Sequence, residues 1–184
     1  GLPLPDTDIK VVDVETGTRE LPAGEAGELC IAGPQVMKGY WNMPEETANV
    51  FRESWLKTGD VGHLDAKGYV TITDRKKDMI VVSGFKVFPN EIESVVASHP
   101  GVLECGAVGV PDDKTGEAVK VVIVKKDPTP TEEAVFLHCK SGLTAYKQPR
   151  YVEFRDSLPK SPIGKVLRRE LRDELRRLPA SQRQ

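Results

Sequence analysis

Five consecutive charged residues, Asp-Arg-Lys-Lys-Asp at positions 74–78, restrict what this chain can fold into more than any other feature. Five adjacent charges do not fit an apolar core, so the run predicts a solvated connection or a functional crossing. The 184 residues suffice for one domain, or for a small domain joined to part of another. We therefore expect two parts, residues 1–75 and residues 76–184.

Composition places the chain among globular proteins and excludes several functional classes. Hydrophobic residues make up 39% and charged residues 29%, which argues against disordered and collagen-like chains. No apolar run approaches the roughly 20 residues of a membrane helix. The net charge of −2 gives no overall field for nucleic acid or anionic lipid, so any basic site must be local.

The chain start and the cysteines indicate a cytoplasmic protein. The first residue is Gly1 rather than Met, and residues 1–10 contain neither the basic nor the apolar segment of a secretory signal, so the start looks cut or processed. Cys30, Cys105 and Cys139 have no CxxC spacing and no histidine at metal-ligand distance in the sequence. We interpret them as reduced structural thiols and expect no metal site.

The first part should consist of antiparallel strands and turns. Short β-type runs at 9–14 and 27–33 are bracketed by Gly and Pro, and a third run lies at 69–73. Residues 44–51 start with Pro and two acids, which predicts a short helix.

The second part should alternate strands and helices, which makes the whole chain α+β. Ser83-Gly84 predicts a turn, and Asn90 followed by Glu93 predicts a capping box at the start of a helix. Strands are expected at 79–82, 104–110, 118–126 and 151–154, with 111–117 as a connecting loop, and a further helix at 131–141. A terminal helix should present one apolar face, formed by Leu167, Leu171, Leu175 and Leu178.

Asp60 ends the segment Trp55-Leu-Lys-Thr-Gly-Asp, which we expect to be the end of a helix and loop. A carboxylate directly after Gly can accept two hydrogen bonds from a vicinal diol such as a ribose, or it can cap a turn. Arg75 could clamp a second polar group of the same ligand, or pair with a neighbouring aspartate on the surface. These motifs alone do not separate a binding role from a structural one.

Lys165 closes the segment Pro-Lys-Ser-Pro-Ile-Gly-Lys at 159–165, directly before a predicted helix. Its ammonium could neutralise a phosphate and a carboxylate together, or could be a solvated lysine at a helix start. The segment is not a phosphate-cradling P-loop, because Leu158 precedes it and Val166 follows Lys165.

The arginine-rich tail at 168–177 invites a nucleic-acid interpretation that its acids oppose. Glu170, Asp173 and Glu174 interleave with the arginines at helical spacing, which favours a salt-bridged amphipathic helix. The three histidines His63, His99 and His138 are dispersed and suggest neither a catalytic relay nor a metal site.

Four segments taken in order resemble a known family: residues 27–41, 55–60, 74–93 and 158–165. They are similar to the C-terminal part of the adenylate-forming superfamily, most closely to bacterial long-chain fatty-acid–CoA ligases. The resemblance implies that residues 1–75 are the last, β-rich and barrel-like subdomain of a large AMP-binding domain. Residues 76–184 would be a complete small α+β lid domain. The implied reaction converts fatty acid, ATP and coenzyme A to acyl-CoA, AMP and pyrophosphate.

The resemblance also implies roles for individual residues in binding the nucleotide. Asp60 and Arg75 would hold the ribose hydroxyls of ATP or AMP. Lys165 would be catalytic and would bridge the substrate carboxylate and the α-phosphate. Lys77 falls at the family's hinge position, about which the small domain rotates between the two half-reactions.

A second set of residues would face coenzyme A. Ser83, Gly84 and Phe85 match the loop that lines the pantetheine tunnel. Lys86 and Lys140 sit where related ligases place cations near the nucleotide end of coenzyme A.

The family's phosphate loop and acyl pocket have no counterpart in these residues, so ATP and Mg2+ would be bound mainly upstream. The chain alone is therefore expected to be inactive. An aryl- or medium-chain-acid ligase, or a non-catalytic module that binds coenzyme A or a nucleotide, remain alternatives. The partners expected are small molecules and not nucleic acid, and peripheral membrane association of the intact enzyme stays open.

Overall fold

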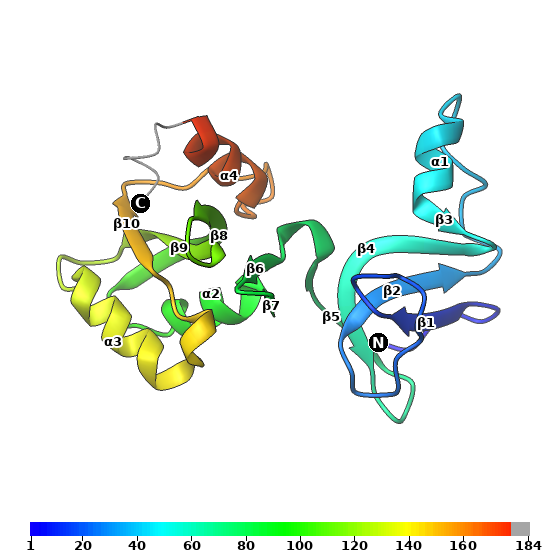
Figure 1. Cartoon of the computed structure of the whole chain (residues 1–184), viewed down its shortest axis with the longest axis horizontal. Helices are drawn as coiled ribbons and strands as arrows, with labels where there is room; N and C mark the ends of the chain where they lie inside the picture. The colour runs from blue at the N-terminus through cyan, green and yellow to red at the C-terminus, as the bar shows by residue number, and fades with distance from the viewer. Residues whose placement is uncertain (178–184) are drawn as a thin grey trace. The chain divides into compact units, whose positions relative to one another are not determined.

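The computed structural model describes residues 1–177 and divides into two compact units, Gly1–Lys77 and Asp78–Gln184 (Figure 1). The described residues form two five-stranded sheets and four α-helices, which confirms the α+β expectation. Leu178, expected on the terminal apolar face, lies outside the described residues.

Unit 1 is built on an antiparallel five-stranded sheet. Its strand order is β1-β2-β4-β3, and β5 pairs with the second half of β4, from Asp60 to Leu64. The strands are β1 (Asp8–Val12), β2 (Gly27–Ala32), β3 (Phe51–Arg52), β4 (Trp55–Leu64) and β5 (Val70–Arg75). Helix α1 (Pro44–Val50) begins at its proline, as predicted, because proline has no N–H to lose at that position.

Unit 2 contains the second sheet, ordered β10-β9-β6-β7 with β8 on β9. Its strands are β6 (Ile80–Val82), β7 (Phe85–Val87), β8 (Val102–Asp112), β9 (Gly116–Lys125) and β10 (Tyr151–Arg155). Its helices are α2 (Pro89–Ala97), α3 (Glu132–Gly142) and α4 (Arg168–Arg177). The β8–β9 connection is shorter than the predicted loop 111–117, because Asp112 already pairs with Gly116.

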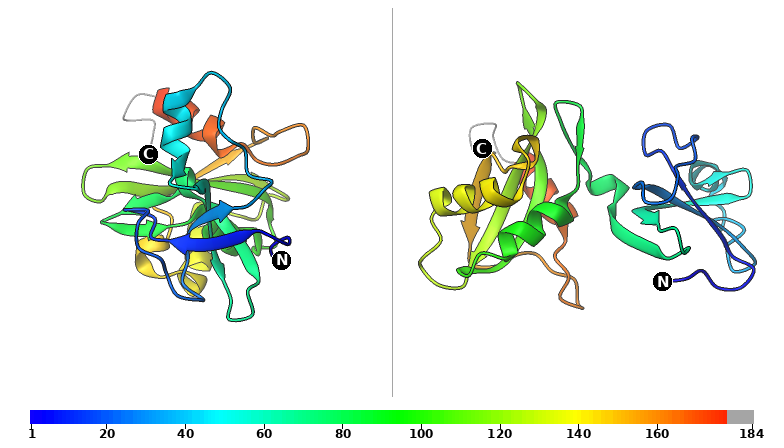
Figure 2. Two further views of the ribbon diagram at one scale, coloured as in Figure 1. Left: turned by 90° about the vertical axis from the view of Figure 1, so that its right-hand side faces the viewer. Right: turned by 90° about the horizontal axis from the view of Figure 1, so that it is seen from below.

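The helices of unit 2 cover both faces of its sheet (Figures 1 and 2). On β9, Val119, Val121 and Ile123 pack with α2 and α3. Val122 and Val124 alternate with them and pack against Leu171 and Leu175 of α4. Unit 2 therefore has a hydrophobic layer on each side of one sheet.

The expectations for the start of α2 and for the charged run are wrong. Asn90 and Glu93 do not form a capping box, since α2 already begins at Pro89, with Phe88 as its N-cap, and both side chains contact Arg168 instead. The charged run is not wholly solvated either. Asp74 is 3% exposed because it lies in β5 opposite the buried Val61.

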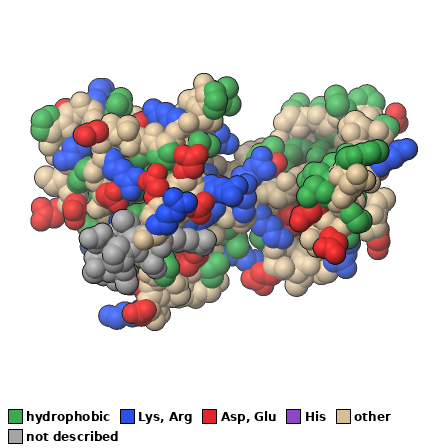
Figure 3. All heavy atoms as spheres, turned by 90° about the horizontal axis from the view of Figure 1, so that it is seen from above, with side chains coloured by type: hydrophobic (Ala, Val, Ile, Leu, Met, Phe, Trp, Pro, Cys, Tyr) green, Lys and Arg blue, Asp and Glu red, His purple; other side chains and the backbone are tan. Residues whose placement is uncertain are grey.

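No helix in the described part of the chain is long and apolar enough to span a membrane. Acidic and basic side chains are interspersed over the face drawn in Figure 3. On α4, Arg169 lies 3.7 Å from Asp173 one turn later, in agreement with the predicted salt-bridged helix.

Candidate functional site

Asp60 and Arg75 are brought together by the pairing of β4 and β5. They are direct partners in the ladder, and Arg75 Nε lies 2.8 Å from Asp60 Oδ1. The predicted helix-and-loop before Asp60 is wrong, because residues 55–64 are one strand. Within residues 1–177 the second oxygen, Oδ2, has no other polar partner, so one face of the carboxylate is available.

A bulge in β4 determines where Asp60 points. Opposite β2, Lys57 pairs with Cys30 and Val61 with Glu28, so Thr58, Gly59 and Asp60 together face a single residue. Gly59 has a φ of +72°, which glycine adopts without a Cβ penalty. The Thr58 hydroxyl donates to the Leu29 carbonyl at 2.8 Å and accepts from the Asp60 N–H at 3.0 Å. The Thr-Gly-Asp sequence is therefore the local cause of the bulge that presents Asp60.

After Arg75 the charged run continues as a single 3₁₀ turn, Lys76–Asp78. Lys76 Nζ lies 2.7 Å from the buried Glu28 carboxylate, which anchors the start of this turn to the sheet of unit 1. Lys77 is the last residue of unit 1 and Asp78 is the first of unit 2.

Ser83 and Gly84 form the two-residue turn of the β6–β7 hairpin. Both have positive φ, +50° and +83°, as a tight hairpin turn requires. The Ser83 N–H donates to the Thr115 carbonyl at 2.9 Å, and the Phe85 ring stacks on Tyr146 with centroids 4.7 Å apart. The sequence predicted this turn but missed the short strand β7 that follows it.

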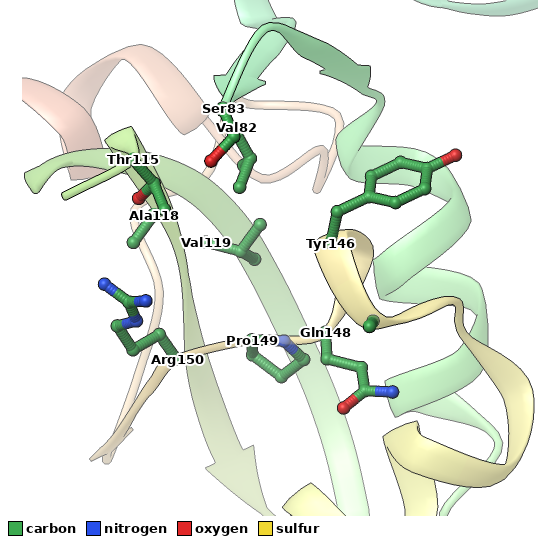
Figure 4. Close-up of a pocket in the computed structure, with 10 residues that line it drawn as sticks. Val82, Ser83, Thr115, Ala118, Val119, Tyr146, Gln148, Pro149 and Arg150 are labelled. Atoms are coloured by element: carbon green, nitrogen blue, oxygen red, sulfur yellow. The ribbon is translucent and has the colours of Figure 1, made fainter.

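A cavity of about 470 Å3 opens beside this turn (Figure 4). Its walls come from β6, the β8–β9 turn, the start of β9 and the segment before β10, and they include Ser83, Thr115, Tyr146 and Arg150. Of the five residues assigned to coenzyme A by resemblance, only Ser83 lines it. Lys86 lies in β7 and Lys140 in the last turn of α3.

Arg150 is the cation of this cavity, and sequence reasoning missed it. It forms an ion pair with Asp112. Hydrogen bonds from Thr115 and Arg150 hold the pKa of the Asp112 carboxyl well below its usual range, and the Asp112 contact raises the pKa of Arg150. The signal available was an aromatic and two cations in the segment Tyr-Lys-Gln-Pro-Arg at 146–150.

Lys165 lies on an exposed loop before α4. Gly164 has a φ of +81°, and its N–H donates to the Ser161 carbonyl at 2.8 Å. The Lys165 carbonyl accepts from the Ser161 N–H at 2.8 Å, and the Lys165 N–H donates to Ser161 Oγ at 3.1 Å. Its ammonium makes no ion pair with any residue that the structure describes.

The cysteines and histidines form no metal centre among residues 1–177. All three cysteines are buried and free. Burial raises the pKa of Cys105 to about 12 and that of Cys139 to about 11, which disfavours the reactive thiolate.

Comparison with known proteins finds two family matches and several similar ligases. Residues 91–165 match the family described as AMP-binding enzyme C-terminal domain, and residues 1–41 match the AMP-binding enzyme family. A long-chain-fatty-acid–CoA ligase of Escherichia coli O6:H1 is 57% identical over 96% of this chain and 31% of its own length. A fatty acid–[acyl-carrier-protein] ligase, ScoC of Streptomyces coeruleorubidus, is 46% identical over 94% of this chain and 33% of its own.

A solved structure supports the same assignment. ATP-bound MatB from Rhodopseudomonas palustris has a TM-score of 0.90 and 41% identity, covering 96% of this chain and 35% of that one. The chain thus spans about a third of the length of the relatives it matches. The family matches at residues 1–41 and 91–165, together with 57% identity over 96% of this chain, support its assignment as part of an AMP-binding, adenylate-forming enzyme.

Proposed function

We propose that this chain is the C-terminal part of an ATP-dependent, AMP-forming long-chain fatty-acid–CoA ligase. The 57% identity to a ligase of that description supports the substrate class. Residues 1–75 would complete the AMP-binding domain and residues 76–184 would form the lid domain.

The observation that carries the proposal is the Asp60–Arg75 pair. A ribose offers two adjacent hydroxyl donors, and a carboxylate with a free oxygen accepts from such a diol. Asp60 is 22% exposed and held from one side by Arg75, which is 50% exposed. A ribose can therefore reach the free oxygen without displacing the pair.

Lys165 would act on the transferring groups. Adenylation brings the carboxylate of the acid and the α-phosphate of ATP together, so a cation fixed between these anions lowers the barrier. The Lys165 ammonium is exposed and forms no ion pair within the described residues, so no internal anion competes for it. Removing such a group costs on the order of 100- to 1000-fold in rate.

The cavity beside Ser83 suits one end of coenzyme A. A guanidinium binds phosphate through paired N–H donors, and an aromatic wall suits a flat base. Arg150 and Tyr146 supply these groups, and Ser83 connects the cavity to the turn proposed to line the pantetheine tunnel. Gly84 and Phe85 extend that turn, whereas Lys86 and Lys140 would reach only the outer phosphates.

The hinge role of Lys77 rests on its place in the chain. Lys77 occupies the 3₁₀ turn at the junction of the two units, where few backbone dihedrals need to change for one unit to rotate. Rotation there would let the small domain present Lys165 for adenylation and the Ser83 turn for thioester formation.

The chain alone is proposed to be inactive. It spans 31% of the length of its ligase relatives, and its described residues hold no cluster of carboxylates, histidines or cysteines for a metal ion. Mg2+ and the acyl chain would be held by residues outside this sequence.

One observation favours a second candidate acceptor. The relative ScoC is named as a ligase for an acyl-carrier protein, and it is 46% identical to this chain. A carrier protein presents the same type of pantetheine thiol without the adenine nucleotide, so it would not need the Arg150 cavity.

Two measurements test the proposal. Titration calorimetry of this chain with AMP, coenzyme A and pantetheine should give heat with coenzyme A that Arg150→Ala removes, and none with pantetheine alone. In a full-length enzyme that carries this chain, fatty-acid-dependent pyrophosphate exchange should fall about 100- to 1000-fold in Lys165→Ala. Thioester formation from supplied acyl-adenylate should persist in that variant. Equal loss of both half-reactions would refute the role given to Lys165, and turnover only with carrier protein would replace coenzyme A as acceptor.

A further inference from the structure

A compact ionic cluster lies at the first residue of unit 2. Both carboxylate oxygens of Asp78 face arginines of α4: Oδ1 lies 3.3 Å from Arg172 Nη1, and Oδ2 lies 3.8 Å from Arg168 Nη1. The two arginines are one helical turn apart, so they present their guanidinium groups to the same carboxylate. The residue that follows the proposed hinge is thus held to the start of the terminal helix.

Arg168 also reaches α2. Its Nε donates to Glu93 Oε1 at 2.7 Å, and its Nη2 contacts Glu93 Oε2 and Asn90 Oδ1. Two parallel bonds from one guanidinium to one carboxylate fix the direction of both side chains. Glu93 Oε1 in turn accepts from the Ala107 N–H at 2.8 Å, which ties the cluster to β8.

The cluster is poorly solvated and electrically balanced. The side chains of Asp78, Arg168, Arg172 and Glu93 are between 11% and 19% exposed, two of them cationic and two anionic. Apolar side chains of similar volume at these positions would stabilise the folded state at least as well. A directional network in that place favours a role in fixing orientation, and the three segments it fixes are the hinge, α2 and the start of α4.

The loop that carries Lys165 is attached directly to this cluster. Arg168 is the first residue of α4 and follows Lys165 by three positions. The loop is closed at its base by the Leu167 N–H, which donates to the Pro159 carbonyl at 2.8 Å, and by the bridge between Lys160 and Val166. The Lys160 ammonium lies 2.6 Å from the Glu104 carboxylate, and this ion pair holds the first half of the loop to β8.

We infer that Arg168 is a positioning residue for Lys165. It joins the Lys165 loop to Asp78, so the direction in which the Lys165 ammonium points is fixed relative to the end of the hinge. The inference rests on the proposed roles of Lys165 and Lys77. Arg168 acts through the loop and through Asp78, without touching a substrate.

The first test uses this chain and needs no catalysis. Arg168→Lys keeps the charge and removes the paired donors. The Leu167 and Ser161 amides, which close the loop, should exchange with solvent about tenfold faster in this variant, as expected when local opening becomes easier. Arg169→Lys, the same change at the exposed neighbour, should leave these amides unchanged, and the Val121 amide in the sheet should be unaffected by either. Unchanged loop amides in Arg168→Lys would overturn the inference.

Asp78→Asn provides a second variant that breaks the cluster from the hinge side. It should accelerate exchange at the same two amides, although Asp78 lies 83 positions before Ser161 in the chain. Acceleration confined to amides next to residue 78 would mean that the hinge and the loop are not joined, and would also overturn the inference.

The second test uses a full-length enzyme that carries this chain. Arg168→Lys should lower kcat of adenylation about tenfold with KM for ATP and fatty acid unchanged, because a misdirected cation stabilises the transition state less. Thioester formation from supplied acyl-adenylate should match that of Arg169→Lys. Equal loss of both half-reactions would indicate a merely structural role and refute the inference.

Lys165→Ala, run in parallel, separates the two hypotheses. If it abolishes adenylation while Arg168→Lys leaves kcat unchanged, the inference fails and the proposed function stands. If Lys165→Ala spares adenylation, the proposed function itself fails.

Discussion

The two units differ in how much apolar surface they bury for themselves. Among the described residues, unit 1 has six buried hydrophobic side chains against seven large hydrophobic side chains that are exposed, while unit 2 has twenty-two against five. The exposed group in unit 1 includes Tyr40, Trp41 and Met43, close together in the chain. Unit 2 therefore has a core on each face of its sheet, and unit 1 has a sheet that needs further apolar cover.

The largest effect should appear when the units are separated. Residues 78–184 expressed alone should unfold in urea in one cooperative transition, because both hydrophobic layers lie within them. Residues 1–77 alone should show a broad, non-cooperative change. Far- and near-ultraviolet circular dichroism, with the whole chain as reference, measures both. A sharp transition from residues 1–77 would show that unit 1 has a sufficient core of its own.

A matched pair of substitutions should give the next largest difference. Val121 in unit 2 and Val61 in unit 1 are both 0% exposed and both central in their sheets. Val121→Ala should lower the free energy of unfolding of its unit by about 2–3 kcal/mol, from lost transfer energy plus a residual cavity. Val61→Ala should cost about 1 kcal/mol, because a thinner core can collapse around the gap.

Amide exchange on each sheet measures these losses separately. Leu137→Ala, at a side chain that is mostly exposed on α3, serves as the control and should stay within about 0.5 kcal/mol of the parent chain. Equal losses at Val61 and Val121 would show that unit 1 is packed as firmly as unit 2.

The elements with strong local signals were predictable. Proline marked the start of α1, paired apolar runs marked β8 and β9, and the interleaved charges of α4 marked a helix. The features that failed depend on partners far along the chain. Glu93 was expected to cap its own helix, yet its partner Arg168 lies 75 positions away. No local period reveals such a partner.

The candidate site shows the same division. Asp60 and Lys165 could be singled out from short motifs with glycine, because each needs a special backbone geometry at one position. The bulge that aims Asp60 depends on how β4 pairs with β2, and the cavity beside Ser83 is assembled from segments between residues 82 and 150. Both therefore required the structure.

The junction between the units gives a smaller, kinetic prediction. In a full-length enzyme that carries this chain, Lys77→Pro should slow the half-reaction that follows rotation about tenfold, which corresponds to about 1.4 kcal/mol. Proline fixes φ and removes the N–H, so the residue cannot change its backbone angles freely. Lys77→Ala removes the side chain but keeps the backbone freedom.

Rates of the two half-reactions, measured separately, check this prediction. Lys77→Ala should behave like the parent enzyme if the hinge acts through its backbone. Unchanged rates of both half-reactions in Lys77→Pro would remove Lys77 from the hinge.

The smallest expected effect concerns the Asp112–Arg150 ion pair, which should add to the stability that the hydrophobic core gives unit 2. Hydrogen bonds from Thr115 and Arg150 hold the pKa of Asp112 below its ordinary value of 3.8, so the folded state binds fewer protons than the unfolded state in that range. This stabilisation is fully present above pH 3.8 and is lost as the pH falls below it toward the folded value. Asp112→Asn should therefore lower Tm at pH 7, and the difference from the parent chain should shrink below pH 3.8.

Asp113→Asn, at the exposed neighbour, should follow the parent chain at every pH. A Tm difference for Asp112→Asn that is independent of pH would mean that the side chain acts through its shape and hydrogen bonds and not through its charge, leaving the hydrophobic layers as the measurable source of the stability of unit 2.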